Sequence, residues 1–287
     1  PGLDPRAGRR AAPSPPLAPA RVLREIPRNS RGPRGATEES PDVTTPSAKA
    51  TGVLKPVLSA QDALADIPDG ATVLIGGFGG AGNPVELIHA LIDQGARDLT
   101  IVNNNAGNGD VGLAALIRER RVAKIICSFP RAASAHAFTE EYQAGRIELE
   151  TVPQGTLAER IRAGGAGVPA FYTRTSVGTP LAEGKEIRAF DGRDYVMEHA
   201  ITGDYALVKC LRADRMGNLT YSKSARNFAP IMCMAAKCAV VQTVELVEPG
   251  AIDPETVVTP GIFTGRIVHT PDAVQEQVLF EQGARYP

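Results

Sequence analysis

The sequence alternates short apolar runs, rich in β-branched residues, with amphipathic segments, and this alternation restricts the fold more than any other feature. Strands are predicted at residues 71–75, 99–102, 123–128 and 147–152. Helices are predicted between and after them, at residues 85–92, 112–118, 132–144 and 156–163. Strands that alternate with helices form right-handed βαβ units. We therefore predict an α/β fold whose mostly parallel sheet is covered by helices on both faces.

The pattern changes after Gly164. Two apolar stretches, residues 187–190 and 195–197, flank Asp191-Gly192, a dipeptide typical of a tight hairpin turn. Residues 205–209 and 239–244 are again strand-like. We expect a small antiparallel excursion that leaves the main sheet and then returns to it.

The two ends of the chain differ from its middle. Residues 1–52 are dominated by Pro, Arg, Ser and Ala, a composition that buries too little apolar surface to offset the entropy of ordering. We expect this extension to be disordered. Its arginines are also typical of a transit peptide, but no amphipathic period accompanies them, so an over-extended start is favoured. One domain is expected over residues 53–270, followed by a C-terminal tail at 271–287 without a strong pattern.

Composition excludes several classes of function. The formal net charge is -1 and the pI is about 6.6, so neither a nucleic acid nor a membrane surface is an expected partner. No apolar run reaches about 18 residues. The four cysteines lack C-x-x-C spacing and are expected to be buried thiols in a reducing, cytoplasmic setting: Cys127, Cys210, Cys233 and Cys238. The four histidines show no metal-binding spacing, and no metal is expected.

A glycine-rich loop follows the first predicted strand. It consists of Gly76, Gly77, Phe78, Gly79, Gly80, Ala81 and Gly82, and we call it the glycine loop. Asn83 and Pro84 then suit the cap and first residue of a helix. The loop matches G-x-G-x-x-G, which favours an NAD-binding oxidoreductase, but that fingerprint needs an acid at the end of the next strand. Asparagines stand there instead. A purely structural loop is a further alternative.

A longer pattern around the loop is more specific. Asp69-Gly70, the apolar residues 73–75, Gly76-Gly77-Phe78 and Gly82-x-Pro84 form, without a gap, the signature of class I CoA-transferases, whose A subunits this chain resembles. The resemblance extends to residues 103–107, 152–162, 181–186, 213–218 and 225–228. It implies a CoA-transferase (NagB-like) fold.

The resemblance also implies a division of labour. In this family the glycine loop is assigned to CoA binding, and backbone N–H groups of Gly77, Phe78 and Gly79 are suited to stabilising a tetrahedral oxyanion. The attacking group is a glutamate of the B subunit in a Ser-Glu-Asn-Gly-like motif, which this sequence lacks. We expect no catalytic side chain here, a partner B subunit in an A2B2 heterotetramer, and ping-pong chemistry through a glutamyl-CoA intermediate. A coenzyme A thioester is then a substrate, with no permanently bound cofactor.

Candidate substrate contacts lie where strands of such sheets end. They are Asn104, Asn105, Gly107, Gln154 and, for a carboxylate or CoA phosphate, Arg131. Each has a structural alternative: the asparagines can satisfy their own loop, and Arg131 can form a surface ion pair.

Two branches of the family compete as the best match. Residues 103–117, 127–131, 230–237 and 259–263 resemble A subunits that serve 3-oxoadipate, whereas residues 156–173 and 201–204 resemble those that serve acetoacetate. We favour transfer from succinyl-CoA to 3-oxoadipate, with acetoacetate as the alternative and a non-enzymatic binding module as the remaining class. One departure affects substrate preference: where the family reads Pro-Thr-Gly-Tyr-Gly-Thr, this chain reads Arg174-Thr175-Ser176-Val177-Gly178-Thr179.

Overall fold

The computed structural model describes residues 53–131 and 134–287, so the extension expected to be disordered lies outside the described residues. Its helices are α1 (Ala60–Leu64), α2 (Val85–Gln94), α3 (Gly112–Arg118), α4 (His136–Gln143), α5 (Gln154–Gly165), α6 (Ala229–Ala235) and α7 (Glu276–Glu281). The large sheet contains β1 (Val57–Leu58), β2 (Thr72–Ile75), β3 (Leu99–Val102), β4 (Val122–Cys127), β5 (Glu148–Thr151), β9 (Gly203–Asp214), β10 (Leu219–Thr220), β11 (Ala236–Val247) and β12 (Arg266–His269).

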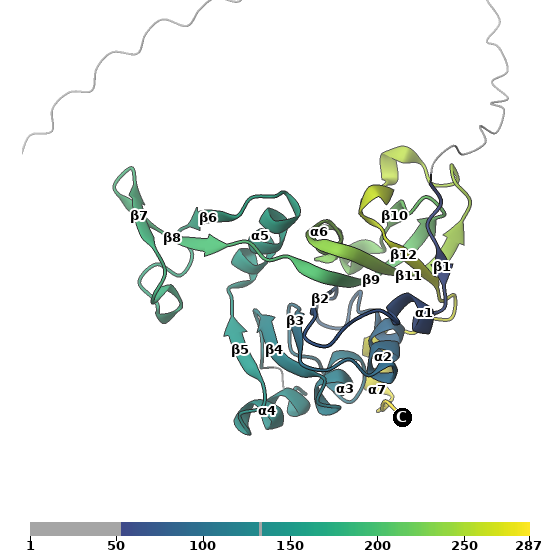
Figure 1. Cartoon of the computed structure of the whole chain (residues 1–287), viewed down its shortest axis with the longest axis horizontal. Helices are drawn as coiled ribbons and strands as arrows, with labels where there is room; N and C mark the ends of the chain where they lie inside the picture. Colours follow the sequence, from purple (N-terminus) through teal and green to yellow (C-terminus); the bar gives the residue numbers. More distant parts are fainter. Residues whose placement is uncertain (1–52, 132–133) are drawn as a thin grey trace, which may run out of the picture. The chain divides into compact units, whose positions relative to one another are not determined.

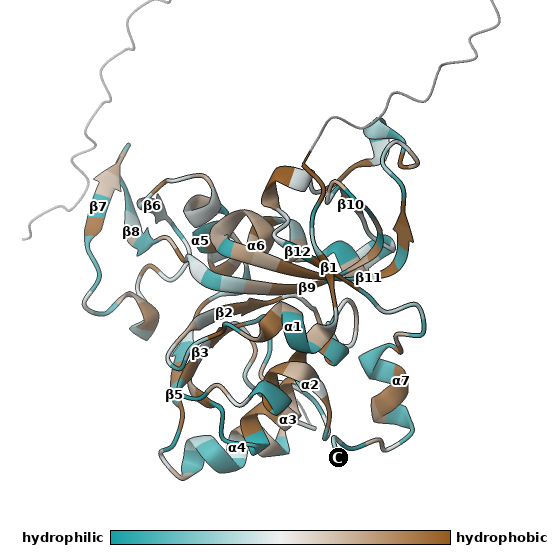
Figure 2. Cartoon of the chain, turned by 45° about the vertical axis from the view of Figure 1, so that its right-hand side comes forward, coloured by the Kyte–Doolittle hydropathy of each residue, from teal (hydrophilic) through white to brown (hydrophobic). Residues whose placement is uncertain are grey.

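The strands of the large sheet run in the order β1-β12-β11-β9-β2-β3-β4-β5, and every pair along this path is parallel (Figure 1). Only β10 pairs antiparallel, on the end of β9. The central strands β2 and β9 are largely hydrophobic, as Figure 2 shows. Strands covered on both faces need such continuous apolar runs.

Each face of the sheet has its own hydrophobic core. Val73 and Ile75 of β2 pack with helices α1 to α4, whereas Leu74 between them packs with α5 and α6. Successive side chains of a strand point to opposite faces, so one strand contributes to both cores. The prediction of an α/β sheet covered by helices on both faces is confirmed.

A three-stranded antiparallel sheet projects from this body (Figure 1). It consists of β6 (Ala170–Thr173), β7 (Ile187–Phe190) and β8 (Arg193–His199) in the order β6-β8-β7. Asp191 and Gly192 form its hairpin turn with φ of 50° and 72°, as an Asp-Gly turn requires. The predicted hairpin is confirmed.

Two expectations need correction. Strands β9 and β11 each span 12 residues, far longer than the apolar runs that predicted them, because they pair with each other along ten positions and continue past the end of β2. Asn83 is not the helix cap: α2 begins at Val85 after Pro84, and the Asn83 side chain is turned to other partners described below. In the described part of the chain, no helix has the length and apolarity needed to traverse a bilayer.

Candidate active site

The glycine loop lies where the order of strands reverses. From β2 the chain proceeds through β3, β4 and β5 on one side, and later through β9, β11 and β12 on the other. Loops at such a reversal diverge and leave a crevice at the carboxyl ends of the strands, where open α/β sheets bind ligands. The N–H of Gly76 still donates to the Leu207 carbonyl oxygen at 2.9 Å, so the loop starts from a fixed point.

The loop requires glycine for two different reasons. At Gly77, φ is +131°, and an added Cβ would lie 1.7 Å from Oδ1 of Asn83. At Gly79, φ is +57°, but the space where a side chain would stand is open. Gly77 is therefore required because its backbone packs closely against the side chain of Asn83. Gly79 leaves open the space that a side chain would fill.

Asn227 holds the loop from the side of β9. Its Oδ1 accepts the N–H of Gly77 at 3.1 Å, and its Nδ2 donates to the Ala81 carbonyl oxygen at 3.1 Å. The N–H of Phe78 donates to the same carbonyl at 3.0 Å. Of the three backbone donors expected to support an oxyanion, that of Gly77 is thus engaged by Asn227 and that of Phe78 by the loop itself. For the N–H of Gly79, residues 53–131 and 134–287 provide no acceptor.

The three asparagines after β3 have different roles. Asn103 is almost fully buried, donates to the Ile75 carbonyl oxygen at 2.8 Å and accepts the N–H of Asn105 at 2.9 Å. It fastens this loop to the end of β2. Asn104 Oδ1 accepts from Ser128 Oγ at 2.8 Å, and Asn105 Oδ1 accepts the N–H of Gly107 at 3.0 Å. The oxygens of both amides are therefore occupied, whereas neither Nδ2 donates to any side chain or carbonyl that the structure describes.

Most of the predicted contact residues line one cavity of about 510 Å³. Its walls are Phe78, Gly79, Asn104, Asn105, Asn108, Ser128, Phe129 and Gln154. Phe78 and Phe129 are 46% and 59% exposed, which leaves an apolar rim open to solvent. Amide donors at the base and aromatic rings at the rim suit a carboxylate attached to an apolar arm.

Two predicted contacts lie elsewhere. Gly107 is packed under α3, where an added Cβ would lie 2.4 Å from the N atom of Ala114, so its glycine has a structural reason. Arg131 is exposed and lines a different hollow, with Tyr142 of α4. It follows Phe129 by two residues, and its role as a ligand contact stays a prediction.

The cavity contains no ionisable side chain among its described lining residues. Ser128 is its one hydroxyl, and that group donates to Asn104 with no base beside it. A serine without a base is a poor nucleophile. Among the described residues, the cavity offers hydrogen-bond donors but no activated nucleophile.

An acid that no sequence pattern singled out lies behind the glycine loop. Glu276, in the short helix α7, is 4% exposed, and its Oε2 accepts from Asn83 Nδ2 at 2.6 Å. Burial raises the pKa of this carboxyl from the ordinary value of 4.5 to about 8. It lines a second cavity of about 480 Å³, together with Gly80 to Asn83 and Lys209. No periodicity or motif in residues 271–287 indicated this contact.

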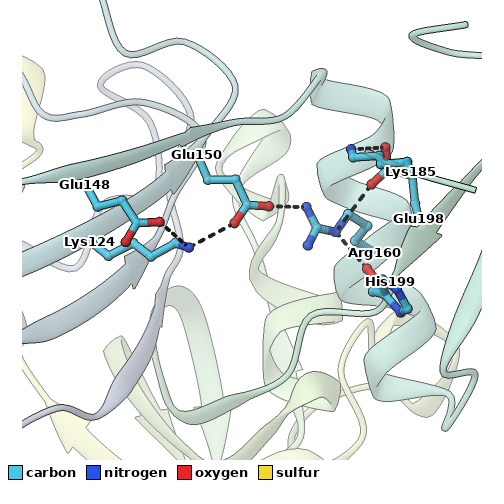
Figure 3. Close-up of polar contacts among 7 residues, drawn as sticks. All are labelled: Lys124, Glu148, Glu150, Arg160, Lys185, Glu198 and His199. Carbon is cyan, nitrogen blue, oxygen red and sulfur yellow. Dashed lines mark hydrogen bonds and ion pairs between the residues drawn. The ribbon is translucent and has the colours of Figure 1, made fainter. Parts of the chain in front are cut away.

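A chain of ion pairs fixes helix α5, whose first residue is Gln154 (Figure 3). Arg160 in that helix donates to Glu150 of β5 at 2.6 Å and to the His199 carbonyl oxygen at 2.7 Å. Lys124 continues the chain on one side, and Lys185 with the buried Glu198 on the other. The network joins the edge of the large sheet to the small sheet across α5, and so fixes where Gln154 meets the cavity.

No group of three His, Cys, Asp or Glu side chains suited to a metal ion occurs within residues 53–131 and 134–287. Three of the cysteines, Cys127, Cys210 and Cys233, are buried thiols, and desolvation raises the pKa of each to about 12. Such thiols are not activated for nucleophilic or ligand chemistry.

A glycine loop at a strand reversal, next to a cavity lined by amides, is an arrangement suited to binding a carboxylate or acyl group at the ends of the strands. The sequence matches the coenzyme A transferase family over residues 57–270, and the chain belongs to that family. The family predicted from the longer sequence pattern is thus confirmed.

Individual relatives are similar along nearly their whole length. The A subunit of 3-oxoadipate CoA-transferase from Pseudomonas putida is 55% identical over 77% of this chain and 95% of its own length. The equally named protein from Acinetobacter baylyi is 58% identical over 75% of this chain and 94% of its own. The A subunit of a probable succinyl-CoA:3-ketoacid coenzyme A transferase from Bacillus subtilis is 49% identical over 75% and 89%, respectively.

A solved structure supports the fold. An acyl-CoA transferase from Escherichia coli O157:H7 superposes with a TM-score of 0.70 at 26% identity, covering 77% of this chain. The match covers 48% of that transferase, so this chain spans about half the length of the solved protein.

Proposed function

We propose that this chain is the A subunit of a 3-oxoacid CoA-transferase that moves CoA from succinyl-CoA to 3-oxoadipate. The observation that carries the proposal is the composition of the 510 Å³ cavity, which combines amide donors and an open glycine with no ionisable side chain among its described lining residues. A partner B subunit then supplies the glutamate, and two copies of each protein form the A2B2 assembly. The subunit names of the relatives support such a partner.

The chemistry follows from a carboxylate attacking a thioester. The partner's glutamate attacks the carbonyl of succinyl-CoA, the C–S bond breaks, and an acyl-glutamyl anhydride and a CoA thiolate result. The thiolate then attacks the glutamyl carbonyl, succinate leaves, and a glutamyl-CoA thioester remains. In the second half-reaction, the carboxylate of the 3-oxoacid attacks the glutamyl-CoA thioester and releases the CoA thiolate, which leaves a mixed anhydride. The thiolate then attacks the acyl carbonyl of that anhydride, so that the new CoA thioester leaves and the glutamate is free again.

Each attack passes through a tetrahedral oxyanion that needs a hydrogen-bond donor in a dry site. Of the three backbone N–H groups predicted to stabilise this oxyanion, that of Gly79 has no acceptor among the described residues and is the proposed donor. The N–H groups of Gly77 and Phe78 are hydrogen-bonded and help to shape the loop. We expect the Nδ2 atoms of Asn104 and Asn105 and the amide of Gln154, which line the cavity, to hold the carboxylate of the acid. The rings of Phe78 and Phe129 are suited to cover the pantetheine arm once a partner closes the cavity.

The preference for 3-oxoadipate rests on the two relatives of that name and on Arg131. Acetoacetate has one carboxylate, whereas 3-oxoadipate has a second with which the guanidinium of Arg131, two residues after Phe129 of the cavity, is proposed to pair. Transfer to acetoacetate is the second candidate, supported by the Bacillus subtilis relative. In an Arg131→Ala variant, we expect KM for 3-oxoadipate to rise several-fold while KM for acetoacetate stays unchanged.

The proposal is tested by co-expressing the full chain with a B subunit that contains Ser-Glu-Asn-Gly. We expect neither protein by itself to transfer CoA, and the complex to do so with succinyl-CoA and 3-oxoadipate. Intact mass spectrometry after incubation with succinyl-CoA alone should find CoA attached to the B subunit, and B with Glu→Ala in that motif should remain unmodified. CoA attached to this chain, or full turnover by this chain alone, would rule the proposal out.

A further inference from the structure

The C-terminal segment packs directly on the back of the glycine loop. An added Cβ at Gly80 would lie 2.8 Å from Cβ of Gln277, and one at Gly112 would lie 2.6 Å from Oε1 of Glu276. Further along the segment, the N–H of Tyr286 donates to the Asp110 carbonyl oxygen at 3.0 Å. Glu276 is therefore wedged between the glycine loop and the start of α3, 193 residues away from Asn83 in sequence.

Asn83 connects this buried acid to the loop. The two N–H bonds of its Nδ2 are both used, one to Glu276 Oε2 at 2.6 Å and one to the Gly79 carbonyl oxygen at 2.8 Å. The Oδ1 of the same amide faces Gly77. Removing the acceptor on Glu276 frees the amide to rotate away from Gly79.

The Gly79 carbonyl is the part of the loop whose orientation needs such support. Gly79 has φ of +57° and no side chain, so the peptide unit between Gly79 and Gly80 meets little steric resistance to turning over. While Asn83 holds the carbonyl oxygen inward, the N–H of Gly80 in the same trans peptide points the opposite way. The hydrogen bond from Asn83 thus fixes the orientation of the Gly79–Gly80 peptide unit.

We propose that Glu276 is a positioning residue for CoA transfer: through Asn83 it fixes the Gly79–Gly80 peptide and keeps the glycine loop in the form that receives the acyl group. This inference rests on the proposed function, but its structural part can be measured without any activity. We assign Glu276 no catalytic role, because it is buried and lines the second cavity rather than the one proposed to take the acyl group.

Because Glu276 can ionise, its role predicts a dependence of loop mobility and kcat on pH. A merely destabilising substitution would not produce this dependence. The side chains that face it are Asn83 from the loop and, across the shared cavity, Lys209 of β9 and Lys223 of the turn after β10, while His89 of α2 lies behind Gly112. Burial lowers the pKa of both Lys209 and His89, and neither forms an ion pair with Glu276 among the described residues. Ionising Glu276 at alkaline pH therefore places a desolvated anion behind the glycine loop, which should loosen the segment that holds Asn83.

The experiment compares Glu276→Ala and Glu276→Gln with Glu281→Ala, an exposed acid of the same helix whose partner is Gln277. Hydrogen exchange at residues 77–82 of the purified chain should accelerate about tenfold or more in Glu276→Ala and stay unchanged in Glu281→Ala. In the complex with B, kcat of Glu276→Ala should fall about tenfold or more, with KM for succinyl-CoA altered less than about threefold.

Glu276→Gln keeps an oxygen acceptor and should retain kcat near pH 7. It should also lack the decline of kcat that we expect of wild type above about pH 8. Loop exchange and kcat of Glu276→Ala within about twofold of wild type would overturn the inference, as would the same alkaline decline in wild type and Glu276→Gln. If the wild-type complex transfers no CoA, the proposed function fails, and hydrogen exchange still decides whether Glu276 fixes the loop.

Discussion

Arg160 Nη1 lies 2.6 Å from Glu150 Oε1, and this contact ties helix α5 to the edge strand of the large sheet (Figure 3). Burial opposes ionisation of Glu150, but the hydrogen bonds and charges of Arg160 and Lys124 together more than compensate and hold the pKa of that carboxyl below its ordinary value. The same guanidinium supports the small sheet through the His199 carbonyl. The side chain of Arg160 therefore connects α5, β5 and the small sheet near Gln154.

Replacing this side chain should cost stability. In Arg160→Ala, the His199 carbonyl loses a donor and Glu150 keeps only Lys124 of its described ion-pair partners. We expect a loss of roughly 2–3 kcal/mol in the free energy of unfolding, between the values for surface and buried pairs. Thermal unfolding should report a Tm lower by about 5 °C or more. Arg162→Ala is the control, because that side chain is half exposed and pairs only with Glu159. Equal Tm values for both variants would contradict the role of Arg160.

Substitution in the glycine loop should separate packing from backbone strain. Gly77→Ala brings a methyl group against Asn83 and displaces the loop, so transfer by the complex should fall by about a hundredfold or more. Gly70→Ala is the matched control, since its φ is also positive, at +74°, while its surroundings are open. That variant should lose only about 1 kcal/mol of stability and keep its kcat. Wild-type kcat in Gly77→Ala would show that the loop is not needed in this conformation.

The departure from the family pattern at residues 174–179 leaves a strained residue. Ser176 stands where the family has glycine and retains φ of +77°, and its Oγ is buried without a partner among the described residues. Ser176→Gly should therefore raise the free energy of unfolding by about 0.5–1 kcal/mol. Gly178→Ala, with φ of +74° in open surroundings, should lower it by a similar amount. Denaturant unfolding of both variants measures the effect, and a less stable Ser176→Gly would disprove it.

The pKa of Glu276 predicts how stability depends on pH. The folded chain keeps this proton up to about pH 8, whereas the unfolded chain releases it near 4.5, so between these values the folded state binds more protons. Its contribution to the free energy of unfolding therefore decreases as pH rises from about 4.5 to 8. Glu276→Gln should remove this contribution, and the difference in Tm between variant and wild type should increase over that interval. A difference independent of pH would contradict the raised pKa.

Much of the site could be predicted from sequence because its main parts are local. The gapless pattern through residues 69–84 identified the family, and the ends of successive strands supplied Phe78, Gly79, Asn104 and Asn105 to one cavity. The same sequence also matched a dinucleotide fingerprint, and the missing acid after the second strand correctly weighed against it. Short apolar runs and Gly or Asn turns determine where strands end. The loop residues that follow each strand can therefore be predicted from the sequence alone.

The sequence by itself determined strands β2 to β5, helices α2 to α5 and the hairpin at Asp191, since hydrophobic period and turn chemistry act over a few residues. The tertiary structure alone decided which backbone donors the loop keeps for a substrate, because Asn227 reaches Gly77 from 150 residues away. It also decided that Asn83 holds a carbonyl rather than capping a helix, and that Glu276 stands behind it. Such contacts join residues with no common periodicity, so only the packing of the sheet, α3 and α7 brings them together.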